Sequence, residues 1–325
     1  MKKGDLFVSH LLAAFTFTCV LSIAISSNAQ TTPQTLKHPA GDYLVVNGAK
    51  LWYESEGKGE PLILIAGGPG YSHSYFHPFF STLADSYRVI YFDAFGCGKS
   101  DRAKSPKEYS FDRDVENVEG IRKALKLDKV IVLGHSYGGL VAQAYAVKYP
   151  ASVKKLILSD SPYNAELWQV GNDYINELVR NQFPEIWEKV QQLRAQGLHS
   201  SAKEHQAAYW NFPLTLIFYY NPASLGKQVL EFNPDVYYQL AGDDADFLIG
   251  GDITKLDFRT ALKNLQMPIL ILTGRFDKTL PPRFMLDYKR FAPKAEFIMF
   301  EQSGHDPFVE EATKYFETVK AFLSR

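Results

Sequence analysis

Residues 129–139 read KVIVLGHSYGG, a stretch in which a strand, a sharp turn and a helix follow one another without a linker. Lys129–Leu133 is a short run of β-branched and aliphatic residues, which predicts a strand. The pentapeptide GHSYG (134–138) follows at once, and a helical pattern begins at Gly139. Glycines at both ends of the pentapeptide allow strand and helix to approach closely. The pattern therefore predicts that Ser136 lies exposed at the tip of a strained turn.

Other short apolar runs predict further strands of the same sheet: Pro61–Ala66, Arg88–Phe92, Val153–Leu158 and Pro268–Leu272. Amphipathic stretches alternate with these runs: Asp112–Leu127, Gly139–Tyr149, Arg283–Phe291 and Pro307–Leu323. Continuous apolar strands are typical of a parallel sheet that is buried on both faces. The alternation predicts a doubly wound, mostly parallel α/β fold. An Asn47-Gly48 turn between Tyr43–Val46 and Leu51–Glu54 predicts a hairpin before it.

The alternation breaks between about Ser161 and Leu256. That segment is rich in aromatic residues and proline, has few strand patterns and lies between two predicted sheet strands. We interpret it as a helical cap, residues 161–256, inserted into the α/β core. The core is then formed by residues 30–160 and 257–325.

The first residues have the pattern of a secretory signal. Lys2 and Lys3 precede an apolar run, Leu11–Ile25, and Ser27-Asn28-Ala29 is a small-residue cleavage site. The run is short for a membrane span, which needs roughly 20 apolar residues. We expect residues 1–29 to be removed near Ala29-Gln30, with export to the periplasm or medium and no stable membrane association; the alternative is an uncleaved anchor.

Composition excludes several classes of function. A net charge of −1, with 22% charged residues, gives no electrostatic reason to expect a nucleic acid or an anionic membrane as partner. Cys97 has no partner once the signal is removed, so no intramolecular disulfide is expected. His73 and His77 are four residues apart, but they lie in a Gly/Pro/Ser-rich region rather than on a helical pattern. We therefore predict no metal and no cofactor.

A serine hydroxyl needs a base to act as a nucleophile, because it is barely ionised at neutral pH. Downstream, PILILTGRFD ends at Asp277 and FIMFEQSGH ends at His305, each just beyond a predicted strand. Active sites of open α/β sheets lie at these carboxyl ends of the strands. We predict that Ser136 is the nucleophile, His305 its base and Asp277 the acid that orients the imidazole. Asp160, after the LILSD strand, is an alternative acid, and His135 is expected to pack rather than react.

An oxyanion hole is expected beside the serine. One donor would be the backbone N–H of Tyr137, the residue after the nucleophile. The other would come from the GGPG loop, residues 67–70, with Gly68 as the best candidate. Glycine allows the backbone to come within hydrogen-bond reach of a substrate. The alternative is a glycine-rich turn that merely reverses the chain.

With these motifs the chain resembles the proline iminopeptidase family of serine peptidases, which have the α/β-hydrolase fold. The similarity lies in GGPG (67–70), in DAFGCGKS (93–100), in GHSYGG (134–139) and in AYAVKY (144–149). It extends to the Gly-x-x-Asp and Ser-Gly-His segments that carry Asp277 and His305, and covers the core from about residue 40 onward. Ala66 stands where the family normally has a histidine before the glycines.

The resemblance implies removal of an N-terminal residue, preferentially proline, with two acidic cap residues holding the substrate ammonium. Asp246 is the nearest match to the second of these acids, and Asp244 is the next. Ala207 occupies the first position, and Glu204, about one helical turn away, is a possible replacement. The alternative is that this acidic stretch is a solvated loop.

Two enzymatic hypotheses follow for the substrate. The first is an aminopeptidase that acts through an acyl-enzyme on a short peptide or similar small molecule. The second is an esterase, lactonase or amidase on the same core, without an ammonium anchor; the missing first glutamate favours it. A binding module without catalysis is a third class, which the full set of catalytic motifs disfavours. The sequence defines neither substrate length nor oligomeric state.

Overall fold

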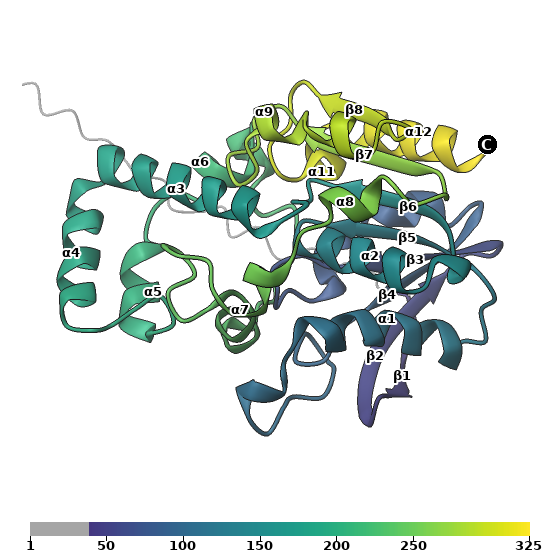
Figure 1. Ribbon diagram of the computed structural model, residues 1–325, viewed down its shortest axis with the longest axis horizontal. Helices are drawn as coiled ribbons and strands as arrows, with labels where there is room; N and C mark the ends of the chain where they lie inside the picture. Colours follow the sequence, from purple (N-terminus) through teal and green to yellow (C-terminus); the bar gives the residue numbers. More distant parts are fainter. Residues whose placement is uncertain (1–38) are drawn as a thin grey trace, which may run out of the picture. The chain divides into compact units, whose positions relative to one another are not determined.

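The computed structural model describes residues 39–325. They contain one sheet of eight strands in the order β1-β2-β4-β3-β5-β6-β7-β8. The strands are β1 Gly41–Val46, β2 Ala49–Glu56, β3 Glu60–Ile65, β4 Tyr87–Phe92, β5 Val130–His135, β6 Val153–Ser159, β7 Ile269–Gly274 and β8 Glu296–Phe300. β2 is antiparallel to both of its neighbours, β1 and β4. The six strands from β3 to β8 are parallel to one another (Figure 1). The predicted doubly wound α/β fold is confirmed. The predicted signal, residues 1–29, lies outside the described residues, so export stays a prediction.

The predicted N-terminal hairpin is also confirmed. β1 and β2 pair with Val46 opposite Ala49, which leaves a two-residue loop. Asn47 and Gly48 have φ values of 50° and 79°, the positive values that a tight hairpin turn requires.

The inner strands separate two apolar cores because successive side chains point to opposite faces. Ile63 and Ile65 of β3 belong to one core, whereas Leu62 and Leu64 belong to the other. The first core is covered by α1 Phe111–Ala124, α2 Tyr137–Lys148, α8 Arg259–Leu262 and α10 Tyr288–Phe291. The second is covered by η1 His73–Phe76, η2 Phe79–Leu83, α11 Pro307–Glu310 and α12 Ala312–Leu323. Burial on both faces explains the uninterrupted apolar runs.

Two predicted helices are each divided in two. The stretch 283–291 forms α9 Pro282–Met285 and α10, and the stretch 307–323 forms α11 and α12. At the second break Glu311 has non-helical backbone angles. Its carboxylate accepts hydrogen bonds from the N–H of Gln302 and the hydroxyl of Ser303, which fixes the start of α12 to the loop after β8.

The segment between β6 and β7 is a helical insertion at the carboxyl ends of the strands (Figure 1). It contains α3 Ala165–Gln182, α4 Pro184–Ala195, α5 Lys203–Tyr209, α6 Thr215–Phe218, α7 Pro234–Ala241 and the short turns η5 Pro222–Ser224 and η6 Gly251–Lys255. Ile175, Val179, Tyr209 and Ile217 contribute to a small core of its own. A bridge between Asn164 and Asp257 joins its two ends. Among residues 39–325, no helix is long and apolar enough to cross a membrane.

Close packing of β5, α2 and β3 predicts the effect of one added methyl group. In Gly138→Ala the Cβ would overlap the carbonyl oxygens of Ile65 and Ala66, which are backbone atoms and yield little. We expect a loss of about 1 to 3 kcal/mol in the free energy of unfolding, measured with urea. Gly197→Ala, with φ +80° and open space around it, should cost only about 1 kcal/mol and is the control. Equal losses in the two variants would contradict this packing argument.

Candidate active site

Ser136 lies in the turn between β5 and α2. Its φ of 54° and ψ of −124° are strained values for a residue with a side chain. The turn is held by hydrogen bonds from the Ser136 N–H to the Ser159 carbonyl, at 3.0 Å, and from the Gly139 N–H to the Ser136 carbonyl, at 2.9 Å. Ser136 is partly exposed and lines a cavity. This geometry is that of a nucleophile elbow.

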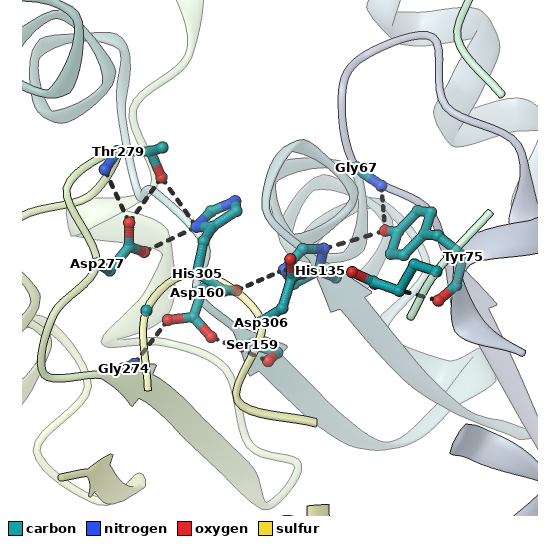
Figure 2. A network of polar contacts seen from close by, with 12 residues as sticks. Gly67, Tyr75, His135, Ser159, Asp160, Gly274, Asp277, Thr279, His305 and Asp306 are labelled. Atoms are coloured by element: carbon teal, nitrogen blue, oxygen red, sulfur yellow. Dashed lines mark hydrogen bonds and ion pairs between the residues drawn. The ribbon is translucent and has the colours of Figure 1, made fainter. Parts of the chain in front are cut away.

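Asp277 and His305 lie together on the loops after β7 and β8 (Figure 2). His305 Nδ1 is 2.8 Å from Asp277 Oδ2. The other carboxylate oxygen, Oδ1, accepts from the Thr279 hydroxyl at 2.7 Å and from the N–H groups of Thr279 and Leu280 at 2.8 and 3.0 Å. The acid is therefore held rigidly while it faces the imidazole. Ser136 and His305 line the same cavity.

Thr279 is a residue that the sequence reasoning missed. Besides its bonds to Asp277, its hydroxyl oxygen is 2.9 Å from His305 Nδ1. The signal was available, because an Asp followed two residues later by Thr is a common local hydrogen-bonding pattern at turns.

The Asp277 carboxylate favours the charged form of His305. Burial alone would lower the pKa of His305, but the charge of Asp277 and the hydrogen bond to it raise that pKa above its usual value. The pair therefore suits the imidazolium that a transfer of the serine proton to the histidine would produce.

Asp160, the alternative acid, lies beside this pair but is not the imidazole's hydrogen-bond partner. Its Oδ1 accepts from the Gly274 N–H at 2.7 Å, and the side chain is fully buried (Figure 2). Burial and the neighbouring charge of Asp277 raise the pKa of Asp160 well above its usual value. A neutral Asp160 would not orient an imidazolium by charge.

His73 is the first residue of the short helix η1, and His77 directly follows that helix. Both are buried, and their Nε2 atoms are each 3.1 Å from a different oxygen of Glu54 on β2. His73 Nδ1 is 2.8 Å from Asp93. Although burial lowers it, hydrogen bonds to Asp93 and Glu54 raise the pKa of His73 to about 9. The cluster is therefore a buried polar network that connects η1 and His77 to the sheet.

The two expected oxyanion donors border the cavity beside Ser136. Gly68 and Tyr137 both line it, and Gly68 has a φ of +113°, which favours glycine. The preceding N–H, that of Gly67, is donated to the Tyr75 hydroxyl at 2.7 Å. It is therefore engaged, and Gly68 is the next donor along the loop.

The cavity above Ser136 has a volume of about 450 Å³ and lies between the core and the cap. Its wall is mostly aromatic and aliphatic, and includes Trp168, Trp210 and Tyr237. Such a wall fits a compact apolar group.

Of the three predicted cap acids, only Asp246 lines the cavity. It is 4% exposed, and its Oδ2 accepts from the Tyr238 hydroxyl at 3.2 Å. Its Oδ1 has no hydrogen-bond partner within 3.5 Å among the described residues, although the Trp210 and Ser200 side chains lie close enough to lower the pKa of the carboxyl. Burial raises the pKa of Asp246 to about 7.

Asp244 and Glu204 lie elsewhere. Asp244 forms a two-pronged ion pair with Arg194, one arm of which is 2.7 Å long, and Glu204 is exposed on α5. Neither borders the cavity, whereas Gln206 and Ala207 do. Since Asp244 and Glu204 were proposed from alignment alone, their orientation could not be read from the sequence.

Comparison with known proteins places this arrangement in a family. The α/β hydrolase fold model matches residues 60–312. The chain is 33% identical over 277 residues to the proline iminopeptidase of Heyndrickxia coagulans, covering 84% of this chain and 93% of that protein. It is 31% identical over 279 residues to that of Clostridium botulinum, covering 84% and 92%.

Solved structures share the fold at lower identity. Proline iminopeptidase of Mycobacterium smegmatis superposes with a TM-score of 0.69 at 20% identity, over 88% of this chain and 98% of that one. A thermophilic esterase of Thermogutta terrifontis gives 0.59 at 22% identity, over 88% and 98%. At these identities the likeness concerns the fold alone.

The contact between His305 and Asp277 predicts a measurable titration. In Asp277→Asn the negative charge is lost, so the imidazolium is less stable and the pKa of His305 should fall by about 1 to 3 pH units. NMR titration of the imidazole protons would measure it. Asp243→Asn, which removes an equal charge from an exposed loop residue, should leave the pKa of His305 unchanged. An unchanged pKa in Asp277→Asn would contradict the pairing.

Proposed function

This chain belongs to the proline iminopeptidase family of α/β hydrolases, and on that basis we propose that this serine hydrolase releases an N-terminal residue, preferentially proline, from short peptides. The observation that carries the proposal is Asp246: a buried carboxylate with one unpartnered oxygen, in the same cavity as Ser136 and His305. The relatives named proline iminopeptidase support the reaction class.

A buried carboxylate oxygen without a hydrogen-bond donor is costly, so a ligand that supplies a cation there gains affinity. The amine of a peptide N-terminus is such a cation, and it is one that internal peptide bonds lack. The aromatic wall of Trp168, Trp210 and Tyr237 suits the pyrrolidine ring of proline. Asp246 would thus select the end of a peptide, and the wall would select its first side chain.

The proposed reaction has two halves. With the amine at Asp246, Ser136 Oγ attacks the carbonyl of the first residue while His305 takes the hydroxyl proton and Asp277 stabilises the imidazolium. The N–H groups of Gly68 and Tyr137 hold the oxyanion. Collapse breaks the C–N bond, and His305 returns the proton to the leaving amine. Water, activated by the same imidazole, then hydrolyses the acyl-enzyme.

A second candidate function is hydrolysis of esters, lactones or amides without a free amine. Ala207 favours it, because this cavity-lining residue stands where the family resemblance expects the first ammonium-binding glutamate. Burial also raises the pKa of Asp246 to about 7, so this carboxyl would be largely neutral in mild acid, and a neutral acid tolerates uncharged acyl groups. Substrates that differ only in their amine distinguish the two functions.

The role of Ser136 predicts covalent labelling. A fluorophosphonate probe should label the wild-type protein at one serine, because the elbow and His305 activate that hydroxyl. Ser136→Ala should abolish labelling, and mass spectrometry of the peptide containing residues 134–138 would locate the adduct. Labelling that persists in Ser136→Ala would contradict the assignment.

The role of Asp246 predicts a substrate-selective loss. Asp246→Asn should raise KM for proline anilide about 10- to 100-fold, since a charge-assisted hydrogen bond is lost, and should leave KM for N-acetylproline anilide and short esters unchanged. In the wild type, KM for proline anilide should fall as the pH rises through about 7, because Asp246 then becomes ionised.

The control is Asp243→Asn, which makes the same change three residues away on an exposed position. It should not alter KM for any of these substrates. If blocking the substrate amine leaves the wild-type rate unchanged, Asp246 does not bind the ammonium group. The hypothesis of an esterase, lactonase or amidase then replaces that of an aminopeptidase.

A further inference from the structure

His135, the residue before the nucleophile, makes polar contacts at both ring nitrogens. It is 4% exposed and was expected only to pack. Its Nδ1 is 3.0 Å from the Tyr75 hydroxyl oxygen, and its Nε2 is 3.0 Å from the backbone carbonyl oxygen of His305 (Figure 2). Asp306 Oδ1 is at 3.4 Å from the same Nε2, farther than the carbonyl. His135 thus connects η1 to the residue proposed as the base.

The direction of each hydrogen bond follows from chemistry. A carbonyl oxygen only accepts, so His135 Nε2 carries the proton. Burial and the charge of His305 lower the pKa of His135 to about 3, so the ring is neutral and its Nδ1 accepts. Tyr75 therefore donates its hydroxyl proton to His135, and the Tyr75 oxygen accepts the Gly67 N–H at 2.7 Å.

The result is one chain of three hydrogen bonds in a single sense: Gly67 N–H to Tyr75, Tyr75 O–H to His135, and His135 Nε2–H to the His305 carbonyl. Its first member adjoins Gly68, and its last is the base residue itself. On the other side, the His305 N–H donates to the Phe218 carbonyl at 2.7 Å. The backbone of His305 is therefore held from the core and from the cap.

We propose that Tyr75 and His135 are positioning residues that set the separation between the oxyanion loop and the catalytic imidazole. Tyr75 occupies the Gly67 N–H and thereby orients the loop so that Gly68 faces the reacting carbonyl. His135 carries that restraint to His305. The inference rests on the roles proposed above for Gly68 and His305, but it is independent of whether the substrate has a free amine.

Such a restraint acts on the transition state more than on substrate binding. Oxyanion donors must lie 2.7–3.1 Å from the developing charge, and small misplacements reduce the rate steeply. Tyr75→Phe keeps the ring, which packs against Phe76 and Phe308, but removes the hydroxyl from both of its hydrogen bonds. We expect kcat to fall by about 10-fold on a short-chain ester, with KM within twofold of the wild type.

The control is Tyr145→Phe. Tyr145 on α2 is also buried, and its hydroxyl donates to Glu119 on α1 at 2.9 Å. This variant should lose a similar amount of thermal stability without loss of kcat. The substrate is a short-chain ester or, if the wild type does not turn one over, proline anilide, and Ser136→Ala supplies the blank. Failure of the ammonium anchor therefore leaves this test intact.

Coupling is tested with a double-mutant cycle. If the two residues form one chain, Tyr75→Phe combined with His135→Phe should lower kcat no further than the worse single change. His135→Gln, whose amide N–H can still donate to the His305 carbonyl, should recover part of the rate. Affinity for a boronate that mimics the tetrahedral intermediate should fall in parallel with kcat/KM.

The proposal is overturned if Tyr75→Phe retains kcat within twofold, or if the two single losses multiply in the double variant. It is also overturned if His135→Gln is no better than His135→Phe. Should Tyr75→Phe fail to fold, the pair His135→Gln and His135→Phe carries the same comparison.

Discussion

The turn at Ser136 holds a residue with a side chain at a φ of 54°, a strained conformation that persists only where its surroundings enforce it. β5 ends and α2 begins on either side of it, and the Ser136 N–H is fixed to the carbonyl of Ser159 on β6. Neighbouring backbone segments must therefore come very close to this turn. The position of a Cβ on Gly67 would be 3.0 Å from the Ser136 Cβ, and Gly134 and Gly138 face backbone atoms directly. Gly67 of the glycine-rich loop and the elbow glycines Gly134 and Gly138 therefore follow from this one turn.

Asp277, Asp160 and Asp246 are buried aspartates whose surroundings differ. Asp277 accepts three hydrogen bonds on one oxygen and faces an imidazole with the other. Asp160 is buried beside that charge, and both effects raise its pKa. Asp246 lies in the cap with an unpartnered oxygen and a pKa of about 7. The surroundings of Asp277 suit the support of a cation throughout the proposed reaction. Those of Asp160 suit a neutral structural acid, and those of Asp246 suit a ligand that brings its own positive charge.

The core and the cap contribute different groups to the site. The proposed reactive groups and the proposed oxyanion loop lie at the carboxyl ends of the strands, where short loops hold them close to the sheet. Asp246 and the aromatic wall come from the insertion, which has its own small core. The same core with a different wall would act on a different acyl group. This division agrees with a fold shared by a proline iminopeptidase and an esterase.

The sequence by itself determined the strand–elbow–helix at Ser136, the Asn47-Gly48 hairpin and the placement of Asp277 and His305 after two strands, because these are local patterns attached to strand ends. The break at Glu311 was missed, since its cause is a hydrogen bond to another loop. Only the tertiary structure decided that Asp246, and not Asp244, faces the cavity: Arg194, 50 residues away, holds Asp244 aside. It also brought Tyr75 to His135 and His135 to His305, across 60 and 170 residues. Contacts of that range depend on how the sheet orders its strands, and no local pattern encodes them.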